Sequence, residues 1–345
     1  MRVAVVLFNL GGPSSLDAVE PFLFNLFHDP AIIRVPQPLR WFLAKLISKR
    51  RAPIARLIYA KMGGSSPILG QTQNQAAALK AALTRNGTHF ETFVAMRYTA
   101  PRAADIIEQV RRFRPNKIVL LPLYPQFSTT TSRSSLREWR SIAKARELEA
   151  PVATICCYPR NAGFIAAQAA LIAESIAKLP PNVKFRLLFS AHGLPQKIVA
   201  SGDPYQAQIE QTAKALVEAL HHEPLDWRVS YQSRVGPMKW IGPSTDNEIK
   251  RAGTEGLALV VAPIAFVSEH SETLVELDIE YNLLATESGV PHYLRVPTVG
   301  THPKFIEGLA NLVQDAVSRD GTKPDGGTRI CPAGCRQCAL EGKPA

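Results

Sequence analysis

Two similar α/β domains, each a parallel β-sheet flanked by helices and facing the other across a cleft, form the fold that the sequence predicts. Short apolar runs alternate with helical patterns along the chain, which is typical of parallel sheets covered by helices. The loops that follow two strands of the first half recur in the same order in the second half. The length of 345 residues allows two domains of ordinary size.

The expected elements come from hydrophobic periodicity. Apolar runs of strand length predict strands at 3–9, 92–96, 117–123, 185–190, 227–231, 257–263 and 292–296. Helical patterns predict helices at 103–112, 201–220 and 271–284. Parallel strands need such crossover helices between them.

Two pairs of segments carry the internal repeat. LFNLGGP at 7–13 is similar to LFSAHGLP at 188–195, and LPLYPQFS at 121–128 is similar to APIAFVS at 262–268. Strand, loop and proline patterns also recur by chance in α/β proteins, but the shared order favours duplication. A cleft between two such domains is a usual ligand site.

The chain is expected to have four parts. An N-terminal domain at 1–155 carries an apolar, basic segment at 22–61, and a second domain covers 156–300. A helix at 301–325 is expected to pack back on the N-terminal domain. Residues 326–345 form a tail that contains cysteines.

The segment 22–61 contains an apolar helical face beside basic residues. Its apolar positions, spaced i, i+3, i+4, i+7 and i+8, are Leu39, Phe42, Leu43, Leu46 and Ile47. The basic residues around them are Arg40, Lys45, Lys49, Arg50, Arg51 and Arg56. This pattern fits a helix that rests on an anionic membrane or lines an apolar pocket, and it also fits an amphipathic helix packed on its own domain.

Charge and cysteine content narrow the function classes. The net charge of +11 suits nucleic acid, anionic lipid or an acidic substrate. No zinc-finger spacing, RNP-like motif or basic tail is present, so a nucleic-acid partner is not expected. The sequence contains no run of about 18 apolar residues, so no membrane-spanning helix is expected. Five cysteines, an odd number, without a signal peptide favour a reducing compartment and hence the cytoplasm.

His192 is the first candidate for chemistry. An apolar run ends at Phe189, and Ser190, Ala191, His192 and Gly193 follow it. The carboxyl end of a parallel strand is where open α/β sheets place their ligands. The position alone is equally consistent with a structural loop histidine.

An acidic row offers His192 a partner. On a helix beginning near Ser271, Glu272 and Glu276 lie on one face, and Glu269 precedes that face. Such a row is usually a solvated surface, but it also suits a track for a divalent cation or for protons. A histidine with one glutamate is too small a set for a stored metal and fits a metal that is handed on, or general-base chemistry.

Five stretches resemble ferrochelatases of the bacterial type. They are SAHGLP at 190–195, YQSRVGPMKWIGP at 231–243, SEHSETLVELDI at 268–279, LFNLGGP at 7–13 and GGSSP at 63–67. The resemblance extends over most of the chain in the family's order. It implies two Rossmann-like, chelatase-type domains and a lyase that inserts Fe(II), its substrate, into protoporphyrin IX to give protohaem, the last step of haem biosynthesis.

The resemblance also implies roles for individual residues. His192 and Glu272 would form the metal and proton site, with Glu269 and Glu276 in the acidic track and His270 beside it. The residues implied to contact the porphyrin are Arg97, Tyr98, Tyr124, Trp240, Leu10 and Lys61. The expected route is distortion of the ring by the cleft walls, removal of two pyrrole protons, and delivery of the metal.

The tail carries a separate signal in Cys331, Cys335 and Cys338. A [2Fe–2S] cluster and a structural zinc both need four ligands. Cys157 or Cys156 would supply the fourth, and the resemblance favours the cluster. The position where animal members carry an internal cysteine is Thr129 here. A flexible tail with free thiols is the alternative.

Other functions fit part of the sequence. The substrate could be coproporphyrin, or the chain could be a non-catalytic tetrapyrrole or metal carrier, although a carrier has no use for a proton acceptor at the ring. A chelatase for a cobalt-bound tetrapyrrole is a third reading. The apolar segment 22–61 favours protoporphyrin and peripheral contact with the cytoplasmic face of the inner membrane. The sequence leaves monomer and homodimer open.

Overall fold

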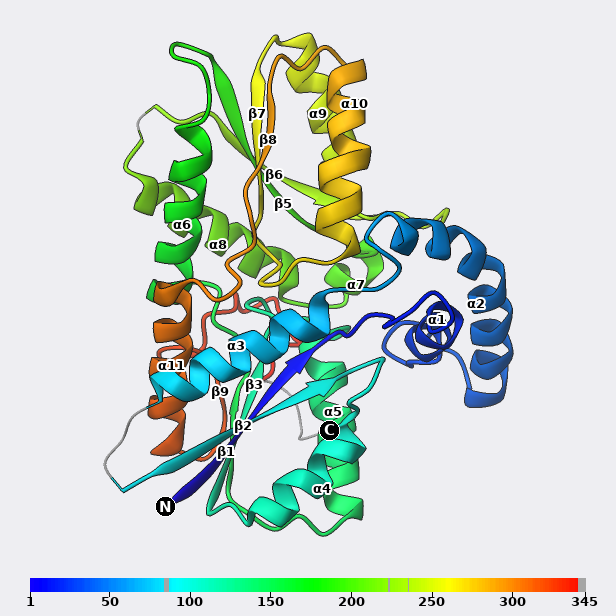
Figure 1. Cartoon of the computed structure of the whole chain (residues 1–345), viewed down its shortest axis with the longest axis vertical. Coiled ribbons are helices and arrows are strands. Elements are labelled where there is room, and N and C mark those ends of the chain that lie inside the picture. Colours follow the sequence, from blue (N-terminus) through cyan, green and yellow to red (C-terminus); the bar gives the residue numbers. More distant parts are fainter. Residues whose placement is uncertain (84–86, 223, 235, 341–345) are drawn as a thin grey trace. The chain divides into compact units, whose positions relative to one another are not determined.

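Two parallel sheets organise the chain, and the four strands of one follow the same order as the first four strands of the other (Figure 1). The computed structural model describes residues 1–83, 87–222, 224–234 and 236–340. Val235, in the predicted motif 231–243, and residues 341–345 of the predicted tail lie outside the described residues. The chain divides into unit 1, Met1–Cys157 with Leu309–Arg329, and unit 2, Tyr158–Gly308 with Ile330–Gly342.

The sheet of unit 1 has the order β2-β1-β3-β4-β9. Its strands are β1 (Arg2–Asn9), β2 (His89–Met96), β3 (Lys117–Pro122), β4 (Val152–Ile155) and β9 (Gly321–Lys323). The pairings within this sheet are parallel. The short strands β4 and β9 were not predicted from the sequence, and β9 lies within the predicted helix 301–325, which ends at Val317.

The sheet of unit 2 has the order β6-β5-β7-β8. Its strands are β5 (Phe185–His192), β6 (Trp227–Gln232), β7 (Ala258–Pro263) and β8 (Tyr293–Arg295). In both units the first strand is central, the second lies on one side, and the third and fourth lie on the other. The predicted pair of parallel, helix-flanked sheets is confirmed, and the matching order agrees with the repeat seen in the sequence.

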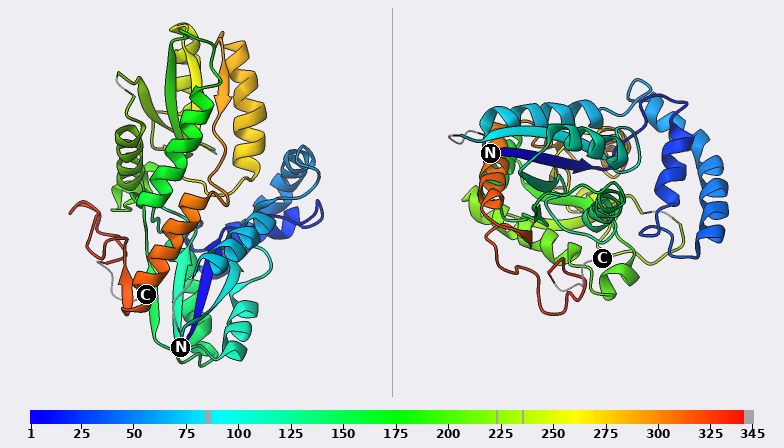
Figure 2. Two further views of the ribbon diagram at one scale, coloured as in Figure 1. Left: turned by 60° about the vertical axis from the view of Figure 1, so that its left-hand side comes forward. Right: turned by 90° about the horizontal axis from the view of Figure 1, so that it is seen from below.

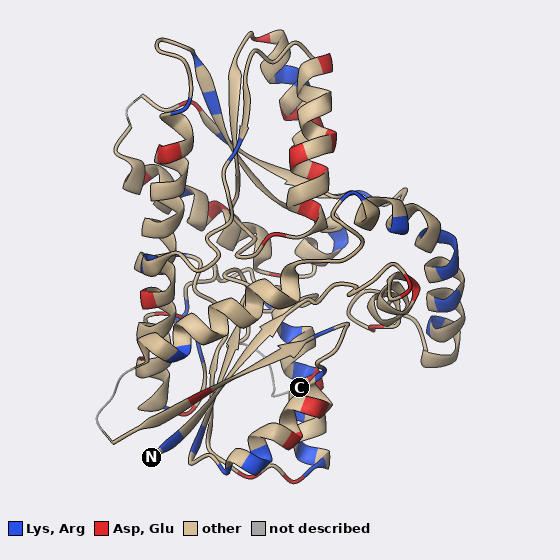
Figure 3. Cartoon of the chain, in the orientation of Figure 1, with Lys and Arg blue, Asp and Glu red and all other residues tan. Residues whose placement is uncertain are grey.

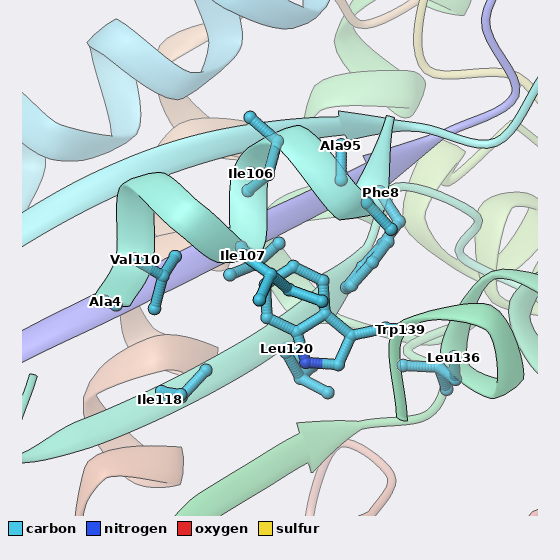
Figure 4. Packing of buried hydrophobic residues seen from close by; sticks show 12 residues of the cluster. Ala4, Phe8, Ala95, Ile106, Ile107, Val110, Ile118, Leu120, Leu136 and Trp139 are labelled. Carbon is cyan, nitrogen blue, oxygen red and sulfur yellow. The ribbon is translucent and has the colours of Figure 1, made fainter. Parts of the chain in front are cut away.

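Two helices cover one face of the sheet of unit 1. They are α4 (Ala103–Phe113) and α5 (Ser132–Ala145). Alternate residues of β1, Ala4, Val6 and Phe8, point into the core beneath them (Figure 4). The ring of Trp139 meets that of Phe8 edge-on, with the centroids 5.6 Å apart. A third helix, α3 (Ile68–Ala82), packs against β1 and β2.

Unit 2 has helices on both faces of its sheet. Leu188 of β5, with Leu259 and Val261 of β7, forms a core with α9 (Thr245–Thr254) and α10 (Tyr281–Glu287). The remaining helices of this unit are α6 (Ala162–Ile176), α7 (Gln196–Ala200) and α8 (Tyr205–Leu220). The helix α11 (Pro303–Val317) begins in unit 2 and continues into unit 1.

The range 271–284 is helical as predicted, but its first part is not an α-helix. Residues Glu272–Glu280 form a π-helix, η1, and α10 follows directly. The wider π turn bonds residue i to i+5 and has no distinctive sequence pattern, so periodicity reads it as an α-helix. The predicted helix at 201–220 begins later, at Tyr205, because Gly202 has a left-handed backbone with φ of 99°.

A pair of helices lies beside the sheet of unit 1 rather than on its faces (Figures 1 and 2). They are α1 (Val19–Phe27) and α2 (Gln37–Ala60). The buried residues of α2 are Ala44, Ser48 and Ala52, spaced i, i+4 and i+8, and Tyr59 near its end. Of the predicted apolar face, Leu39, Phe42 and Leu46 are 52%, 66% and 47% exposed, and Leu43 and Ile47 are half-buried. The helix α2 therefore leaves much of its predicted apolar face uncovered within unit 1.

In the described part of the chain, none of the helices combines the length and apolar character needed to cross a bilayer.

Candidate active site

His192 is the last residue of β5, where it pairs in register with Gln232 at the end of β6. Its Nδ1 lies 2.5 Å from the carbonyl oxygen of Gly193. A carbonyl can only accept a hydrogen bond, so Nδ1 carries the proton. When the ring is neutral, the Nε2 atom therefore has a lone pair that can accept a proton or bind a metal, and when Nε2 carries a proton the ring is a cation beside Glu272.

Because Gly193 has no side chain, the ring of Trp240 can pack close to His192. The Gly193 N–H donates to the carbonyl oxygen of Gln232 at 2.8 Å. A Cβ at this position would lie 2.9 Å from that oxygen and 3.2 Å from the ring of Trp240. The position therefore needs glycine, and the Trp240 ring packs directly on the residue after His192.

Glu272, the first residue of η1, lies between two imidazoles. Its Oε1 is 3.6 Å from Nε2 of His192, and its Oε2 is 3.4 Å from Nε2 of His270. Burial alone would raise the pKa of the Glu272 carboxyl, but the charge of His192 and the hydrogen bond and charge of His270 outweigh it and lower the pKa to about 2. Glu272 is therefore an anion at neutral pH.

Glu276 has the opposite character. Its carboxylate accepts from the N–H of Ser233 at 2.8 Å, from the hydroxyl of Ser233 and from the side-chain amide of Gln232 at 3.0 Å. Burial and the negative charge of Glu272 nevertheless raise the pKa of Glu276. Two neighbouring carboxyls on η1 are thus shifted in opposite directions, which is the arrangement of an acid and base pair. Figure 3 shows the acidic residues gathered along η1 and α10.

Glu269 is held by a cation. Its Oε1 accepts from Arg295 at 2.6 Å and from the N–H of Thr298 at 2.9 Å. The charge of Arg295 and these hydrogen bonds overcome burial and lower the pKa of Glu269. The residue joins the start of η1 to the end of β8. Its place in the acidic track stays a prediction.

Three residues of this site received no role from the sequence. Gln232 and Ser233 hold Glu276, and the hydroxyl of Tyr205 in α8 interacts with the backbone of His192. Gln232 and Ser233 lie within the motif 231–243, which was the only signal available for them. Tyr205 has no sequence signal, because its contact depends on how α8 packs beside β5.

Unit 1 holds the other predicted porphyrin contacts. Tyr98 N–H donates to the carbonyl oxygen of Leu10 at 3.0 Å, so these two residues lie together. Tyr124 follows β3, and burial raises the pKa of its hydroxyl. Lys61 is exposed at the end of α2. That these residues and Trp240 of unit 2 line one cleft stays a prediction.

Arg97 and Tyr98 are buried more deeply than a simple binding surface requires. The Arg97 side chain is 11% exposed and pairs with Asp29 and Glu138, each at 2.8 Å. The Tyr98 hydroxyl donates to Asp29 at 2.9 Å. Burial would raise the pKa of Asp29, but the charge of Arg97 and the hydrogen bonds lower it. Asp29 received no role from the sequence, since nothing in its neighbourhood marks it.

Comparison with known proteins decides the family. A sequence profile of the family described as Ferrochelatase matches residues 2–317. The chain belongs to the ferrochelatase family. A ferrochelatase from Phenylobacterium zucineum is 54% identical over 341 residues, covering 98% of each chain. A ferrochelatase from Caulobacter vibrioides is 54% identical over 321 residues, covering 92% of this chain and 91% of the relative. A ferrochelatase from Rickettsia felis is 46% identical over 341 residues, covering 98% of this chain and 97% of the relative.

Membership confirms the predicted enzyme class. The ferrochelatase family consists of ferro-lyases that insert iron into a porphyrin for haem synthesis, and the chain is such an enzyme. Iron is its substrate, and the porphyrin is the partner that the family implies.

Solved structures confirm the chelatase-type fold. SirB from Bacillus subtilis with Fe3+ matches with a TM-score of 0.55 at 13% identity, covering 92% of this chain and 96% of SirB. The sirohydrochlorin chelatase SirB from Bacillus subtilis subspecies spizizenii in complex with cobalt gives 0.52 at 12% identity, with the same coverage.

The cysteines of this ferrochelatase-family chain divide between its two units. Cys156 and Cys157 are buried in unit 1, with their sulfur atoms 3.7 Å apart. Cys331, Cys335 and Cys338 lie on a loop of unit 2 held against α8, where the amide of Gln208 is 3.2 Å from the sulfur of Cys331. Within the described ranges, no group of three or more His, Cys, Asp or Glu side chains is placed to hold a metal ion.

Proposed function

We propose that this chain inserts Fe(II) into protoporphyrin IX with His192 and Glu272 as one metal and proton site. The observation that carries this proposal is the Glu272 carboxylate between two imidazoles at the end of β5, beside a second carboxyl whose pKa is raised. Anaerobic metalation assays of His192 and Glu272 variants test it.

The protons and the metal that the reaction must move indicate what each side chain does. Insertion of Fe(II) releases two pyrrole N–H protons, and the four nitrogens then bind the metal. Nε2 of His192 accepts one of the two protons. The ionised Glu272 receives the other proton, or it receives the metal and the second proton goes to Glu276. Imidazole nitrogen and carboxylate oxygen both suit Fe(II). Glu276, which takes up protons at higher pH than an ordinary glutamate, passes them away from the ring.

Distortion of the porphyrin ring also lowers the activation barrier for metal insertion. A flat free-base porphyrin has two N–H groups and two nitrogen lone pairs in the ring plane, where a metal approaching from one face cannot reach them. Trp240 beside His192 offers an apolar wall for the macrocycle. Contacts remote from the nitrogens would stabilise a bent ring more than a flat one and so lower the barrier.

The exposed apolar residues of α2 favour protoporphyrin over coproporphyrin as the substrate. They also favour a membrane surface as the place where the enzyme acts. The exposed Leu39, Phe42 and Leu46 lie opposite the buried face of α2, and Lys and Arg flank them (Figure 3). Such a helix binds at an anionic bilayer surface. Protoporphyrin has two propionates where coproporphyrin has four, so it partitions into lipid more readily. We place the enzyme in the cytoplasm, in peripheral contact with the inner membrane.

Acidic substitutions on α2 test the membrane proposal. We expect Phe42→Glu with Leu46→Glu to weaken binding to vesicles containing anionic lipid at least about tenfold, because each removes a large apolar side chain from the interface. KM for vesicle-borne protoporphyrin should rise, while KM for water-soluble coproporphyrin should not. Leu283→Glu, at an exposed apolar position of α10, is the matched control. Vesicle binding equal to that of the unchanged protein would contradict the proposal.

The tail remains the proposed place of a [2Fe–2S] cluster. Its three thiols have the donor chemistry of such a cluster, but the described side chains as placed form no ligand set. No step of the reaction is assigned to the group. Cys331, Cys335 and Cys338 would each ligate it, with Cys157 or Cys156 as the fourth ligand.

Anaerobic purification tests the cluster. We expect a coloured protein with iron and labile sulfide, and loss of the colour in Cys335→Ser. Of Cys156→Ser and Cys157→Ser, one should abolish the colour and the other should keep it. A colourless protein without iron or labile sulfide would rule the cluster out.

A further inference from the structure

Asp29 is a buried acid of unit 1 whose two carboxylate oxygens both accept hydrogen bonds. Its side chain is fully buried, and it lies in the connection between α1 and α2. Its Oδ2 accepts from Arg97 at 2.8 Å, from the hydroxyl of Tyr98 at 2.9 Å and from the hydroxyl of Ser134. Its Oδ1 accepts from the N–H of Ala31 at 2.8 Å. One carboxylate thus joins the α1–α2 connection, the end of β2 and the helix α5.

The Arg97 guanidinium is committed to protein groups. Nε donates to Ser134 at 2.9 Å, Nη1 to Glu138 at 2.8 Å and Nη2 to Asp29. Glu138 also accepts from Arg102. A cation held between two carboxylates is fixed in place, and drawing it away would remove the nearest cation from the fully buried Asp29. Its place in the structure suits orientation of neighbouring groups.

Tyr98 connects the helical pair to the sheet in three ways. Its ring packs in the cluster formed by Val19, Phe22, Leu23, Ala52 and Tyr59 of α1 and α2. Its carbonyl oxygen accepts from Asn25 of α1 at 2.9 Å, and its hydroxyl is held by Asp29. The α1–α2 pair covers neither face of the sheet, so these contacts and Asp29 fix its position.

We propose that Asp29 is a positioning residue for the reaction, which sets Arg97 and Tyr98 and holds the α1–α2 pair against the end of β2. The proposal rests on the proposed function, because Arg97 and Tyr98 are the predicted porphyrin contacts. Asp29 itself touches no substrate. Its charge is needed, since a neutral amide of the same shape would leave the Arg97 guanidinium short of one carboxylate.

Asp29→Asn tests the proposal with two readouts. Amide hydrogen exchange should speed up about tenfold in α1, α2 and their connection, while β1 and β3 keep their protection, because only the attachment of the pair is lost. KM for the porphyrin should rise about tenfold, while kcat changes less than about threefold. A tenfold change in KM is an ordinary size for the coupling between two groups that do not touch each other. Asp17→Asn, an exposed acid just before α1, is the matched control and should change neither readout.

Ser134→Ala is the milder second variant should Asp29→Asn fail to fold. It removes one hydroxyl from Asp29 and Arg97 but keeps both charges, and it should shift both readouts in the same direction by less. Unchanged exchange and KM in both variants would overturn the proposal. Exchange that speeds up equally in β1 and β3 would overturn it too, since it indicates general loss of stability. If the unchanged protein metalates no porphyrin, the proposed function fails, and exchange still tests the attachment.

Discussion

His192→Ala is expected to lower kcat for insertion of Fe(II) into protoporphyrin IX by about 10³-fold, within the range for loss of a general base. The Nε2 lone pair, freed by the bond from Nδ1 to the Gly193 carbonyl, has no substitute at the end of β5. The neighbouring His270 contacts the other oxygen of Glu272 and is buried. The measurement is the initial rate of haem formation under anaerobic conditions.

A matched control separates this loss from a general effect of removing an imidazole. His89 is exposed in unit 1, and His89→Ala should metalate at the rate of the unchanged protein. KM for the porphyrin should change little in His192→Ala, because the alanine removes a reacting group rather than a wall of the site. A His192→Ala variant with a raised KM and a normal kcat would make His192 a binding residue instead.

Glu272→Gln is expected to lower kcat by about 10²-fold or more, in the range of lost acid–base catalysis. The amide has the shape of the carboxylate but neither its charge nor its basicity, and Glu272 is an anion because its pKa is lowered to about 2. Glu276→Gln, four residues along η1, is the matched comparison and should cost about tenfold. A larger loss in Glu276→Gln than in Glu272→Gln would reverse the assignment of the two acids.

The pH profile distinguishes the two acids further. The pKa of Glu276 is raised, so it becomes protonated as the pH falls through a value above its ordinary range, and the rate of the unchanged protein should decline there. Glu276→Gln should lose that acid limb and keep a lower, flatter rate. The lowered pKa of Glu272 places its own titration at much more acidic pH.

The positions of His192 and Glu272 in the fold were predicted from the sequence more completely than their partners. The strand–loop boundary placed His192 at the end of β5, and the acidic row placed Glu272 at the start of a helix, while the roles of both residues stay a prediction. The π-helix could not be predicted, because the sequence does not show whether a helical N–H bonds the carbonyl four or five residues before it. Asp29 and Tyr205 act through contacts between segments far apart in the chain, which no local pattern encodes.

The helix α2 shows a different limit of what hydrophobic periodicity can predict. Its apolar positions Leu39, Phe42, Leu43, Leu46 and Ile47 were recognised as one face, but periodicity does not say whether that face is covered. The small residues Ala44, Ser48 and Ala52 allow close packing of the opposite face on α1. Three of the five apolar residues are exposed, which only the structure reveals.

Single-turnover metalation tests the central assignment most directly. Protoporphyrin IX is first bound to the protein under anaerobic conditions, with binding followed by porphyrin fluorescence, and Fe(II) is then added in excess. We predict that His192→Ala binds the porphyrin as the unchanged protein does and forms haem at least about 10²-fold more slowly. Haem formation at the unchanged rate in this variant would contradict the assignment of His192 and Glu272 as the metal and proton site.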